Sequence, residues 1–569
     1  ESQKTQLTWL SAVSLPIPTM ARVARNPIFW LGRTLVALAG GLCAGLALPN
    51  FNVWPAILIS VALVHLAIYR LKIWPAFPLG LISGIAFYGS QSVWMSRYLG
   101  PEPWLALACL EGLIFALGVA VSAAVWSAFG VISSKISSTD GHKANGILVD
   151  AGLALWLSLI WVAREWVACH WPYGGYQWSR LGQSAANSWL SGLAFWGGVS
   201  LVSLAVSWMS IFALLSAIRL SVKFDREQAL KTVLALVVPA LAGLVTLAGI
   251  TLIGPTKTIS VVAIQGNANA GLFANPVPGS ILSKHLAVTY RFLKKFGSNY
   301  DLMVWPENSS DVDPLANPLA KRSLMDVVQL SRHPLLVGAV TGNDGTRNSV
   351  IHNSGLLYQP HREKPIQYDK LRPVPFGEYV PDRPFWRALA PQLIDLIYRG
   401  FTPGTHSGVM RVENAGTKFK IGDLICFEIG IDELSHDLVR GGAQLITSQA
   451  NNADFGHTAE AFQQEALVRL QAIATGRSIV HASTVATTEI VSPSGSVLAS
   501  TKPFKPGFAY ARVELRSGLT PAMRLFGWVD WMALIGVATG IAGFSWTTFR
   551  RKSHRSLSGN VQAAEIVSK

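Results

Sequence analysis

The sequence predicts a membrane protein in two parts: a polytopic α-helical domain of about eight spans, and an α/β layered domain inserted before the last span. Hydrophobic residues make up 50% of the 569 positions and charged residues only 14%, whereas soluble chains carry roughly a quarter charged residues. Apolar runs of about 20 residues, the length that crosses a bilayer, recur along the first 250 residues or so. The stretch from about 256 to 515 instead alternates strand-like and helical patterns.

The apolar runs are the candidate spans. They lie near 31–48, 54–71, 76–97, 104–131, 147–168, 189–218, 231–253 and 527–547. From them we expect five regions, which are a cytoplasmic N-terminus at 1–30, a seven-span membrane domain at 31–255, an extracytoplasmic domain at 256–520, a C-terminal span at 521–548 and a basic cytoplasmic tail at 549–569.

The positions of Lys and Arg predict the orientation of these spans. Cytoplasmic loops are enriched in basic residues. Successive loops lie on opposite sides of the membrane, and in this chain basic loops alternate with loops that are rich in Trp and poor in Lys and Arg. If the basic loops are cytoplasmic, the domain at 256–520 lies outside the cytoplasm. The same loops account for much of the net charge of +15, and no basic stripe with interleaved aromatics predicts nucleic-acid binding. The basic loop residues are Arg70, Lys72, Lys135, Lys143, Arg219, Lys223, Arg226 and Lys231.

Three ionisable residues fall inside the candidate spans, where an unpaired charge is costly. Arg164 and Glu165 are adjacent in the fifth span and can pair with each other, and Glu111 lies in the fourth. Both helix packing and contact with a substrate fit these residues, so the sequence leaves the two open.

The domain at 256–520 alternates β-branched apolar runs with helical patterns. This order is typical of an α/β layered fold, in which functional residues gather where strands end. We expect strands at 258–265, 301–307, 334–341, 349–359, 365–370, 418–428, 443–451, 478–484, 488–495, 496–501 and 507–513, and helices near 278–297, 315–332, 432–440 and 458–475.

One cysteine in this domain is a candidate nucleophile. The chain has four cysteines, without a CxxC pair or a metal-ligand spacing, and only Cys426 falls in the α/β domain. It follows an apolar strand at a turn toward a helix, where backbone amides and nearby cations favour the thiolate. Taken alone, a cysteine after a strand is also compatible with a simple core position.

Two further strand ends supply the groups that a thiol nucleophile needs. Glu307 follows a strand in VWPENS, and a carboxylate there can accept the thiol proton. Lys370 ends the segment PIQYDK, before a Pro- and Gly-rich loop that carries Glu378. A lysine can stabilise the oxyanion formed in acyl transfer, a contribution of about 3 kcal/mol per donor.

The motifs VWPENS, YDKLRPVPFGEYVP and ICFEIG, in this order, resemble the nitrilase (carbon–nitrogen hydrolase) superfamily. Because these motifs lie between seven predicted N-terminal spans and one C-terminal span, the chain resembles one family of that superfamily, the apolipoprotein N-acyltransferases. The resemblance covers essentially the whole chain and implies an α-β-β-α sandwich. It also implies that Glu307 is the general base, Lys370 the oxyanion stabiliser and Cys426 the nucleophile.

The resemblance implies roles for other residues near this site. Glu378 and Glu428 match acidic positions that support the triad, and Asn353 matches an asparagine in the same neighbourhood. Trp305 and Phe427 lie beside the motifs, and we expect them either to line a substrate channel or to belong to the core.

The implied reaction is a two-step acyl transfer in a bacterial inner membrane. The cysteine takes an acyl chain from a membrane phospholipid as a thioester, and the α-amino group of a diacylated apolipoprotein then attacks it. A thioester is already activated toward amines, so no metal and no cofactor is expected. A membrane-anchored amidase with water as acceptor and a degenerate, lipoprotein-binding paralogue are the alternatives.

The chain departs from the family pattern at several positions. An arginine replaces a histidine at Arg372, and Phe427 stands where tyrosine is frequent. The later departures are Asn452, Gln471 and Ala474, and Ala168 replaces an arginine in the fifth span. These changes bear on lid geometry and substrate preference, because no triad member is lost.

Overall fold

The computed structural model describes residues 26–542, except for 50, 140–145, 223, 253–254, 256, 272–273, 275–276, 343–348, 398–399 and 415. The predicted basic tail at 549–569 lies outside the described residues, as do Lys143, Lys223 and nearly all of the predicted N-terminal region at 1–30.

Six helices among the described residues are long and apolar enough to cross a membrane. They match six of the predicted spans. The predicted second and eighth spans correspond to shorter apolar helices, α4 (Ala56–Ile68) and Trp528–Ala542. A helix of 13 residues is about 20 Å long, less than the ~30 Å of a hydrocarbon core, so the count of about eight spans is not confirmed. The long helices are α3 (Pro27–Ala47), α5 (Ile73–Gln91), α7 (Pro101–Thr139), α8 (Gly146–His170), α10 (Ala194–Val222, preceded by the 3₁₀ turn Trp189–Leu193) and α11 (Arg226–Leu252).

Glycines allow two of these helices to pack closely. A Cβ built on Gly84 of α5 would lie 2.8 Å from the Cα of Gly112 on α7. Such close contacts between small residues replace the hydrophobic driving force that lipid does not supply.

The α/β domain contains two six-stranded sheets, which confirms the predicted sandwich. The strand order is β12-β1-β2-β3-β4-β5 in one sheet and β11-β10-β9-β8-β7-β6 in the other. The first sheet is built from β1 (Lys257–Gln265), β2 (Leu302–Val304), β3 (Leu335–Thr341), β4 (His352–Tyr358), β5 (Ile366–Asp369) and β12 (Gly507–Leu515). The second comprises β6 (Val409–Asn414), β7 (Thr417–Ile425), β8 (Leu445–Ala450), β9 (Ile479–Ser483), β10 (Glu489–Val491) and β11 (Val497–Ser500).

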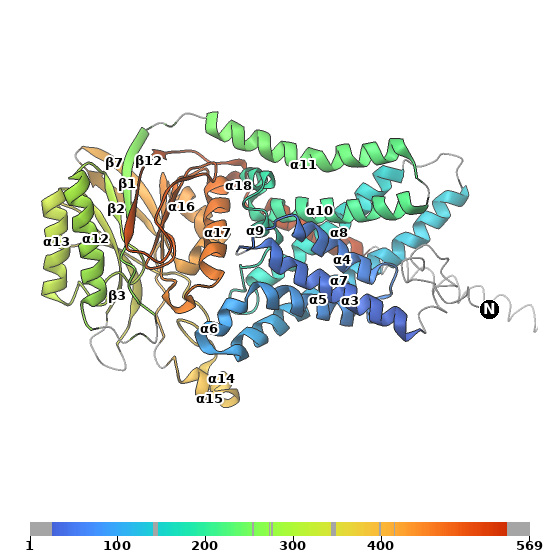
Figure 1. Ribbon diagram of the computed structural model, residues 1–569, viewed down its shortest axis with the longest axis horizontal. Coiled ribbons are helices and arrows are strands. Elements are labelled where there is room, and N and C mark those ends of the chain that lie inside the picture. The colour runs from blue at the N-terminus through green and yellow to red at the C-terminus, as the bar shows by residue number, and fades with distance from the viewer. Residues whose placement is uncertain are drawn as a thin grey trace, which may run out of the picture.

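Helices cover both outer faces of the sandwich (Figure 1). Helices α12 (Ser280–Phe296) and α13 (Pro318–Ser331) pack on the face of the first sheet that is farthest from the membrane helices. Helices α16 (Asp432–Arg440) and α17 (Glu460–Thr475) lie between the second sheet and the membrane helices. Apolar side chains of both sheets form the core between the two sheets.

Several elements differ from the predicted ones. Strand β2 stops at Val304 instead of reaching Glu307. Pro306, two residues further on, has no N–H for the ladder. Strand β7 ends at Ile425, so that Cys426 opens a 3₁₀ turn, η3 (Cys426–Gly430). The elements that the sequence analysis missed are β6, α14 (Arg383–Leu389), α15 (Pro391–Ile394) and α18 (Pro521–Arg524).

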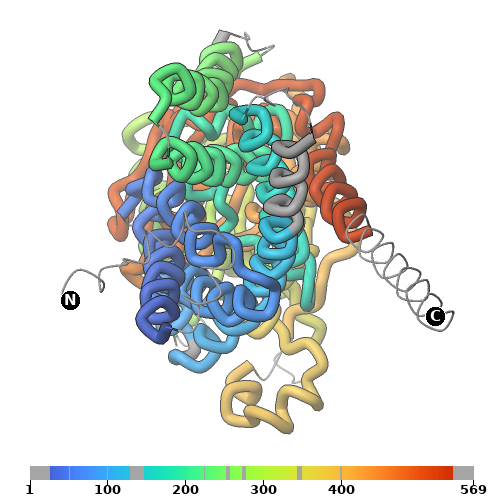
Figure 2. Tube along the Cα trace, turned by 90° about the vertical axis from the view of Figure 1, so that its right-hand side faces the viewer, coloured from blue at the N-terminus to red at the C-terminus, as the bar shows by residue number. Residues whose placement is uncertain are grey.

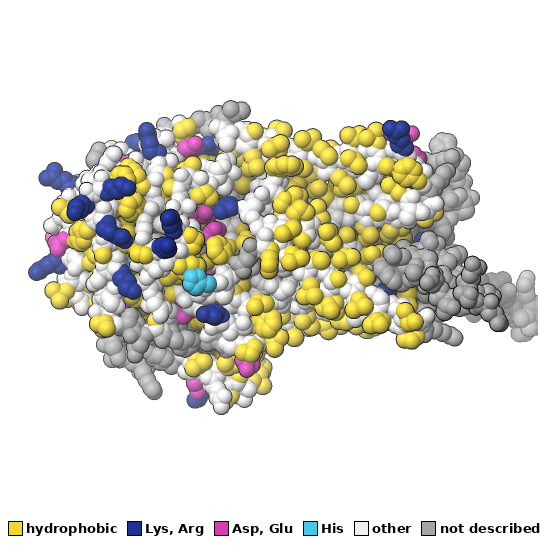
Figure 3. Space-filling view, in the orientation of Figure 1, with side chains coloured by type: hydrophobic (Ala, Val, Ile, Leu, Met, Phe, Trp, Pro, Cys, Tyr) yellow, Lys and Arg dark blue, Asp and Glu magenta, His cyan; other side chains and the backbone are white. Residues whose placement is uncertain are grey.

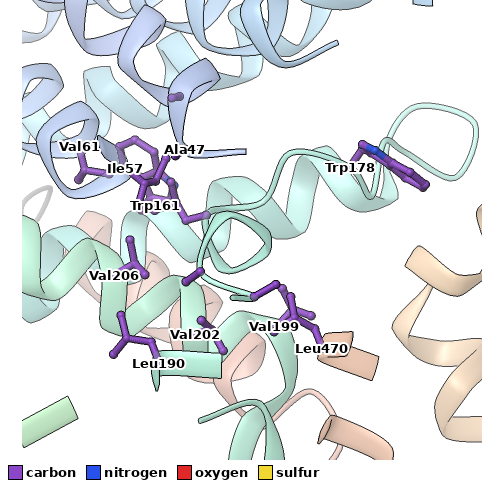
Figure 4. Close-up of a cluster of buried hydrophobic side chains, with 14 of the residues drawn as sticks. Ala47, Ile57, Val61, Trp161, Trp178, Leu190, Val199, Val202, Val206 and Leu470 are labelled. Atoms are coloured by element: carbon purple, nitrogen blue, oxygen red, sulfur yellow. The ribbon is translucent and has the colours of Figure 1, made fainter. Parts of the chain in front are cut away.

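One continuous apolar core joins the membrane helices to the α/β domain. Figure 4 places Leu470 of α17 beside Val199 and Val202 of α10. Hydrogen bonds add to this contact, because the Gln463 side chain accepts from the indole N–H groups of Trp94 and Trp178, at 3.1 Å each. The two parts of the molecule are therefore packed against each other.

The surface follows the same division. In Figure 3, apolar side chains cover the helical half of the visible face, while Lys, Arg, Asp and Glu concentrate on the α/β half. Figure 2, viewed from the end of the helix bundle, shows the segment with α14 and α15 standing out to one side. An apolar belt of this kind fits a membrane-embedded half and a water-facing half.

Candidate active site

The three predicted triad residues converge at one edge of the sandwich. Glu307 follows β2, Lys370 follows β5 and Cys426 follows β7. The Lys370 Nζ lies 3.6 Å from Glu307 Oε1, and both side chains are almost completely buried. The Cys426 thiol lies close enough to the Glu307 carboxyl group for the two to affect each other's pKa. A thiol, a carboxyl group and an ammonium group therefore share one buried site.

The backbone turns sharply at the cysteine. Cys426 has φ +57°, a left-handed conformation that costs a non-glycine residue roughly 1–3 kcal/mol. The strand ends at this turn and η3 begins, so the thiol projects from the end of β7 and is half-buried rather than enclosed. Such strain persists only where surrounding contacts fix the backbone.

Glu428 provides those contacts. Its Oε2 accepts hydrogen bonds from the Ile425 amide at 2.8 Å and the Tyr368 hydroxyl at 2.9 Å. Its Oε1 accepts from the amides of Leu371 and Arg372, at 2.8 and 3.0 Å. One buried carboxyl group thus ties the cysteine turn to the backbone that follows the lysine.

Glu378 and Asn353 complete the site. Glu378 Oε1 accepts from Lys370 Nζ at 2.9 Å and from Asn353 Nδ2 at 2.9 Å. The same Asn353 Nδ2 also donates to Glu307 Oε1 at 2.7 Å. Glu378 Oε2 accepts from the Val374 amide at 2.7 Å, which holds the loop in place. Asn353 therefore bridges two carboxyl groups that would otherwise repel each other.

Burial and charge set the protonation of the triad. Burial raises the pKa of Glu307, and Lys370 opposes this shift. Burial lowers the pKa of Lys370, but the carboxylates of Glu378 and Glu307 outweigh it, so the ammonium form is favoured overall. Burial and then the Glu307 charge raise the pKa of the Cys426 thiol. These shifts favour the protonated thiol form of Cys426 in the resting site.

The two predicted channel residues lie in different surroundings. Trp305 is fully buried in the outer core, with its ring centroid 5.6 Å from that of His285. Of the two environments expected for Trp305, a substrate channel or the core, this is the core. Phe427 stacks on Trp178 with centroids 5.7 Å apart and planes within 6°. Phe427 therefore lies where the cysteine turn meets the membrane domain.

Loops of the membrane domain cover this edge of the sandwich. Tyr98, in the connection between α5 and α7, donates to the Gly377 carbonyl at 3.2 Å, next to Glu378. Tyr173, in the Trp- and Gly-rich segment 171–178, donates to Asp382 Oδ2 at 2.9 Å. The side of the site toward the membrane is thus built from both parts of the chain.

Two of the departures from the family pattern, Gln471 and Asn452, fall around the site rather than in it. Gln471 donates to Asp432 Oδ1 at 2.6 Å, and Arg180 of the membrane domain pairs with the same carboxylate at 2.7 Å. Asn452 donates to Gln464 Oε1 at 3.1 Å. Gln471 therefore belongs to the contact between the two domains, and Asn452 to the loop after β8. Nothing in the structure explains Ala168.

The ionisable residues of the fifth span pair with each other. Arg164 Nη2 lies 3.6 Å from Glu165 Oε1, and Arg164 also donates to the Tyr88 hydroxyl at 2.7 Å. Glu165 Oε1 accepts from the Leu181 amide at 2.9 Å. These contacts join α8 to α5 and to the following loop, as expected for residues that hold helices together.

Sequence reasoning missed one buried acid close to the triad. Glu460, the first residue of α17, is 3% exposed, and its charge acts on both Glu307 and Cys426. The segment AEAFQQEAL alternates polar and apolar residues like an ordinary helix start, so the sequence carries no signal that this glutamate is buried.

Known proteins resemble both parts of the chain. The apolipoprotein N-acyltransferase N-terminal domain matches residues 40–212 and the carbon–nitrogen hydrolase domain matches residues 279–518. An amidase of the nitrilase superfamily from Nesterenkonia resembles the α/β part, with a TM-score of 0.34, 15% identity, and coverage of 46% of this chain and 93% of the amidase.

Relatives of similar length match nearly end to end. The apolipoprotein N-acyltransferase of Mycolicibacterium smegmatis is 30% identical over 531 residues, which cover 89% of this chain and 83% of the relative. That of Azotobacter vinelandii is 28% identical over 548 residues, or 94% and 98% of the two chains. The chain therefore belongs to the apolipoprotein N-acyltransferase family.

Proposed function

We propose that this protein transfers an acyl chain from a membrane phospholipid to the α-amino group of the N-terminal S-diacylglyceryl-cysteine of apolipoproteins. The observation that carries the proposal is the buried cluster of Cys426, Glu307 and Lys370 at the edge of the α/β domain that meets the membrane helices. Substrates anchored in a bilayer reach such an edge without leaving the membrane.

In the first half-reaction, Cys426 attacks the ester carbonyl of the phospholipid while Glu307 accepts the thiol proton. Lys370 stabilises the oxyanion of the tetrahedral intermediate, together with a backbone amide of the cysteine turn. When the intermediate collapses, the C–O bond breaks, Glu307 returns the proton to the leaving alkoxide, and lysophospholipid departs. The acyl chain remains on Cys426 as a thioester.

In the second half-reaction, the neutral α-amine of the lipoprotein attacks the thioester carbonyl. Glu307 accepts an N–H proton and passes it to the leaving thiolate, which regenerates the Cys426 thiol and leaves an amide. Glu378, Asn353 and Glu428 keep the triad in place through the hydrogen bonds described above.

We further propose that the α/β domain lies on the extracytoplasmic side of the bacterial membrane. The α8 end that carries His170 contacts Glu433 of the α/β domain, so the loops at the other end of the bundle face away from it. Those loops, after α4 and around the junction of α10 and α11, carry the described basic residues Arg70, Lys72, Arg219, Arg226 and Lys231. The positive-inside rule assigns this end to the cytoplasm.

The test follows the acyl chain. Purified protein is mixed with phospholipid vesicles of one defined acyl composition, and its intact mass is measured. We expect one added acyl chain on the protein and none on a Cys426→Ala variant. Adding an S-diacylglyceryl-cysteine peptide should remove that mass and yield the N-acylated peptide. An unmodified protein, or release of free fatty acid without acylated peptide, would contradict the proposal.

A further inference from the structure

The proposed mechanism assigns no role to Glu460, a buried acid near the thioester. Glu460 is 3% exposed, and within the described part of the chain its Oε2 has no hydrogen-bond partner. A buried, unpartnered carboxyl oxygen is costly, and such groups call for an explanation, a functional role being one.

The fold brings Glu460 to the cysteine turn. Strand β8 pairs in parallel with β7, so the chain leaves β8 at the edge where β7 ends, just before Cys426. Helix α17 then packs against η3, and a Cβ on Gly430 would lie 3.5 Å from Leu467. Residues 460, 463 and 467 share one face of a helix by their spacing. Glu460 thus lies on the face of α17 that is turned toward η3.

The neighbour on that face supports this position. Gln463 accepts a hydrogen bond from Trp178, and Trp178 stacks on Phe427, the residue after the cysteine. Both Cys426 and Glu307 feel the charge of Glu460. Glu460 is therefore a buried acid whose charge acts on the nucleophile and on the base, and so on an amine that attacks the thioester.

We propose that Glu460 is a catalytic residue of the second half-reaction, in which it takes up the proton that the α-ammonium group of the lipoprotein must lose before its amine can attack. This inference rests on the proposed function. The ammonium group transfers one proton to the Glu460 carboxylate and becomes a neutral amine. Glu307 then handles the second proton as the C–N bond forms and the C–S bond breaks. Glu460 finally releases its proton to water.

The electrostatics of the site suit this exchange. Burial, and then the charges of Glu307 and Glu465, raise the pKa of Glu460 to about 8. An α-amino group has a pKa of about 7.7–8.0, close to that of Glu460. Most Glu460 is therefore protonated at pH 7, and the group acts as a base once the positive charge of the bound ammonium group favours its carboxylate form. The titratable groups around Glu460 are Glu307, Cys426, Glu465 and, from the loop of the membrane domain, Tyr176. None of these is a cation that would repel an ammonium group.

The experiment separates the two half-reactions. A Glu460→Gln variant is first loaded with an acyl chain from phospholipid vesicles, and intact mass gives the rate of thioester formation. The synthetic S-diacylglyceryl-cysteine peptide is then added in excess, and loss of the thioester is timed from pH 6.5 to 9.5. We expect loading at the rate of the unsubstituted protein and aminolysis slower by up to about tenfold at pH 7, because roughly a tenth of a free α-amine is already neutral there and attacks without a base. The deficit should disappear by pH 9.5, where the peptide amine is already neutral.

The matched control is Glu489→Gln, which removes another buried carboxyl group. Glu489 lies on β10 and pairs with Arg469 at 3.4 Å. This variant should retain both rates and the pH profile. Aminolysis by Glu460→Gln at the normal rate, or a deficit that is the same at every pH, would overturn the inference. If the unsubstituted protein forms no thioester, the proposed function itself fails, and the two failures are thereby told apart.

Discussion

Lys370 illustrates how much of the site depends on a single charge. Its ammonium group lies 3.6 Å from the nearest oxygen of Glu307 and 2.8 Å from that of Glu378. Replacing it by methionine keeps much of the volume, removes the oxyanion donor and leaves two acids facing each other. We expect a Lys370→Met variant to form the thioester at least ~100-fold more slowly, as measured by intact mass over time. Lys364→Met, at an exposed position before β5, should act normally. Equal rates for the two variants would contradict the role of Lys370.

The raised pKa of Glu307 predicts the pH dependence of thioester formation. A protonated Glu307 cannot accept the thiol proton, so the rate should rise with pH through the pKa of this group. Because burial raises that pKa, the rise should occur above the usual range near 4.5. The charge of Glu378 also raises it, so Glu378→Gln should move the rise to lower pH while slowing the reaction. A rise that stays in place or moves to higher pH would show that Glu378 does not act on the base electrostatically.

At this scale, the strand ends in the sequence pointed to residues that the structure brings together, and the family resemblance supplied the roles expected of them. Glu307, Lys370 and Cys426 each follow an apolar strand, and the Glu378 loop follows the lysine directly. Glu460 could not be found in this way, because its burial depends on how α17 packs against its neighbours in three dimensions.

At the scale of elements, regular amphipathic segments were predictable and interrupted ones were not. The helix predicted at 432–440 has these bounds in the structure, with apolar residues on one face. Helices α14 and α15 were missed because RPFWRALAPQLI places prolines at close intervals and buries few side chains. Their short lengths offer little periodicity to detect.

Helix α17 carries the contact between the two parts of the molecule. Nearly all of its residues are buried, as expected for a helix covered on both sides. Gln463 receives two indole N–H groups and donates to the Gln91 carbonyl at 3.0 Å. We expect Gln463→Ala to leave two buried donors unpaired, at about 1–3 kcal/mol each, and to lower the midpoint of thermal unfolding in detergent. Gln367→Ala, on an exposed strand position, is the control. An unchanged midpoint would mean that water replaces the lost acceptor.

At the scale of the whole molecule, the sequence predicted two parts but not how they fit. Hydropathy separates the apolar spans from the α/β domain, because a bilayer requires long apolar runs. It does not indicate that Trp178, from a loop between spans, packs on the cysteine turn, or that Tyr98 contacts the loop that carries Glu378. Contacts between residues hundreds of positions apart leave no local periodicity in the sequence.

The arrangement predicts that the two ends of the molecule lie on opposite sides of the membrane. Lys418, at the start of β7, and Glu227, at the start of α11, are both well exposed, with 59% and 73% of their side chains accessible. In sealed spheroplasts, a membrane-impermeant maleimide should label Lys418→Cys at once and Glu227→Cys only after lysis, since basic loops stay in the cytoplasm. The unsubstituted chain gives the background from its own four cysteines. The opposite result would be labelling of Glu227→Cys before lysis and protection of Lys418→Cys. It would put the Cys426 thiol on the cytoplasmic side, away from lipoproteins of the outer leaflet. The proposed acceptor would then be wrong.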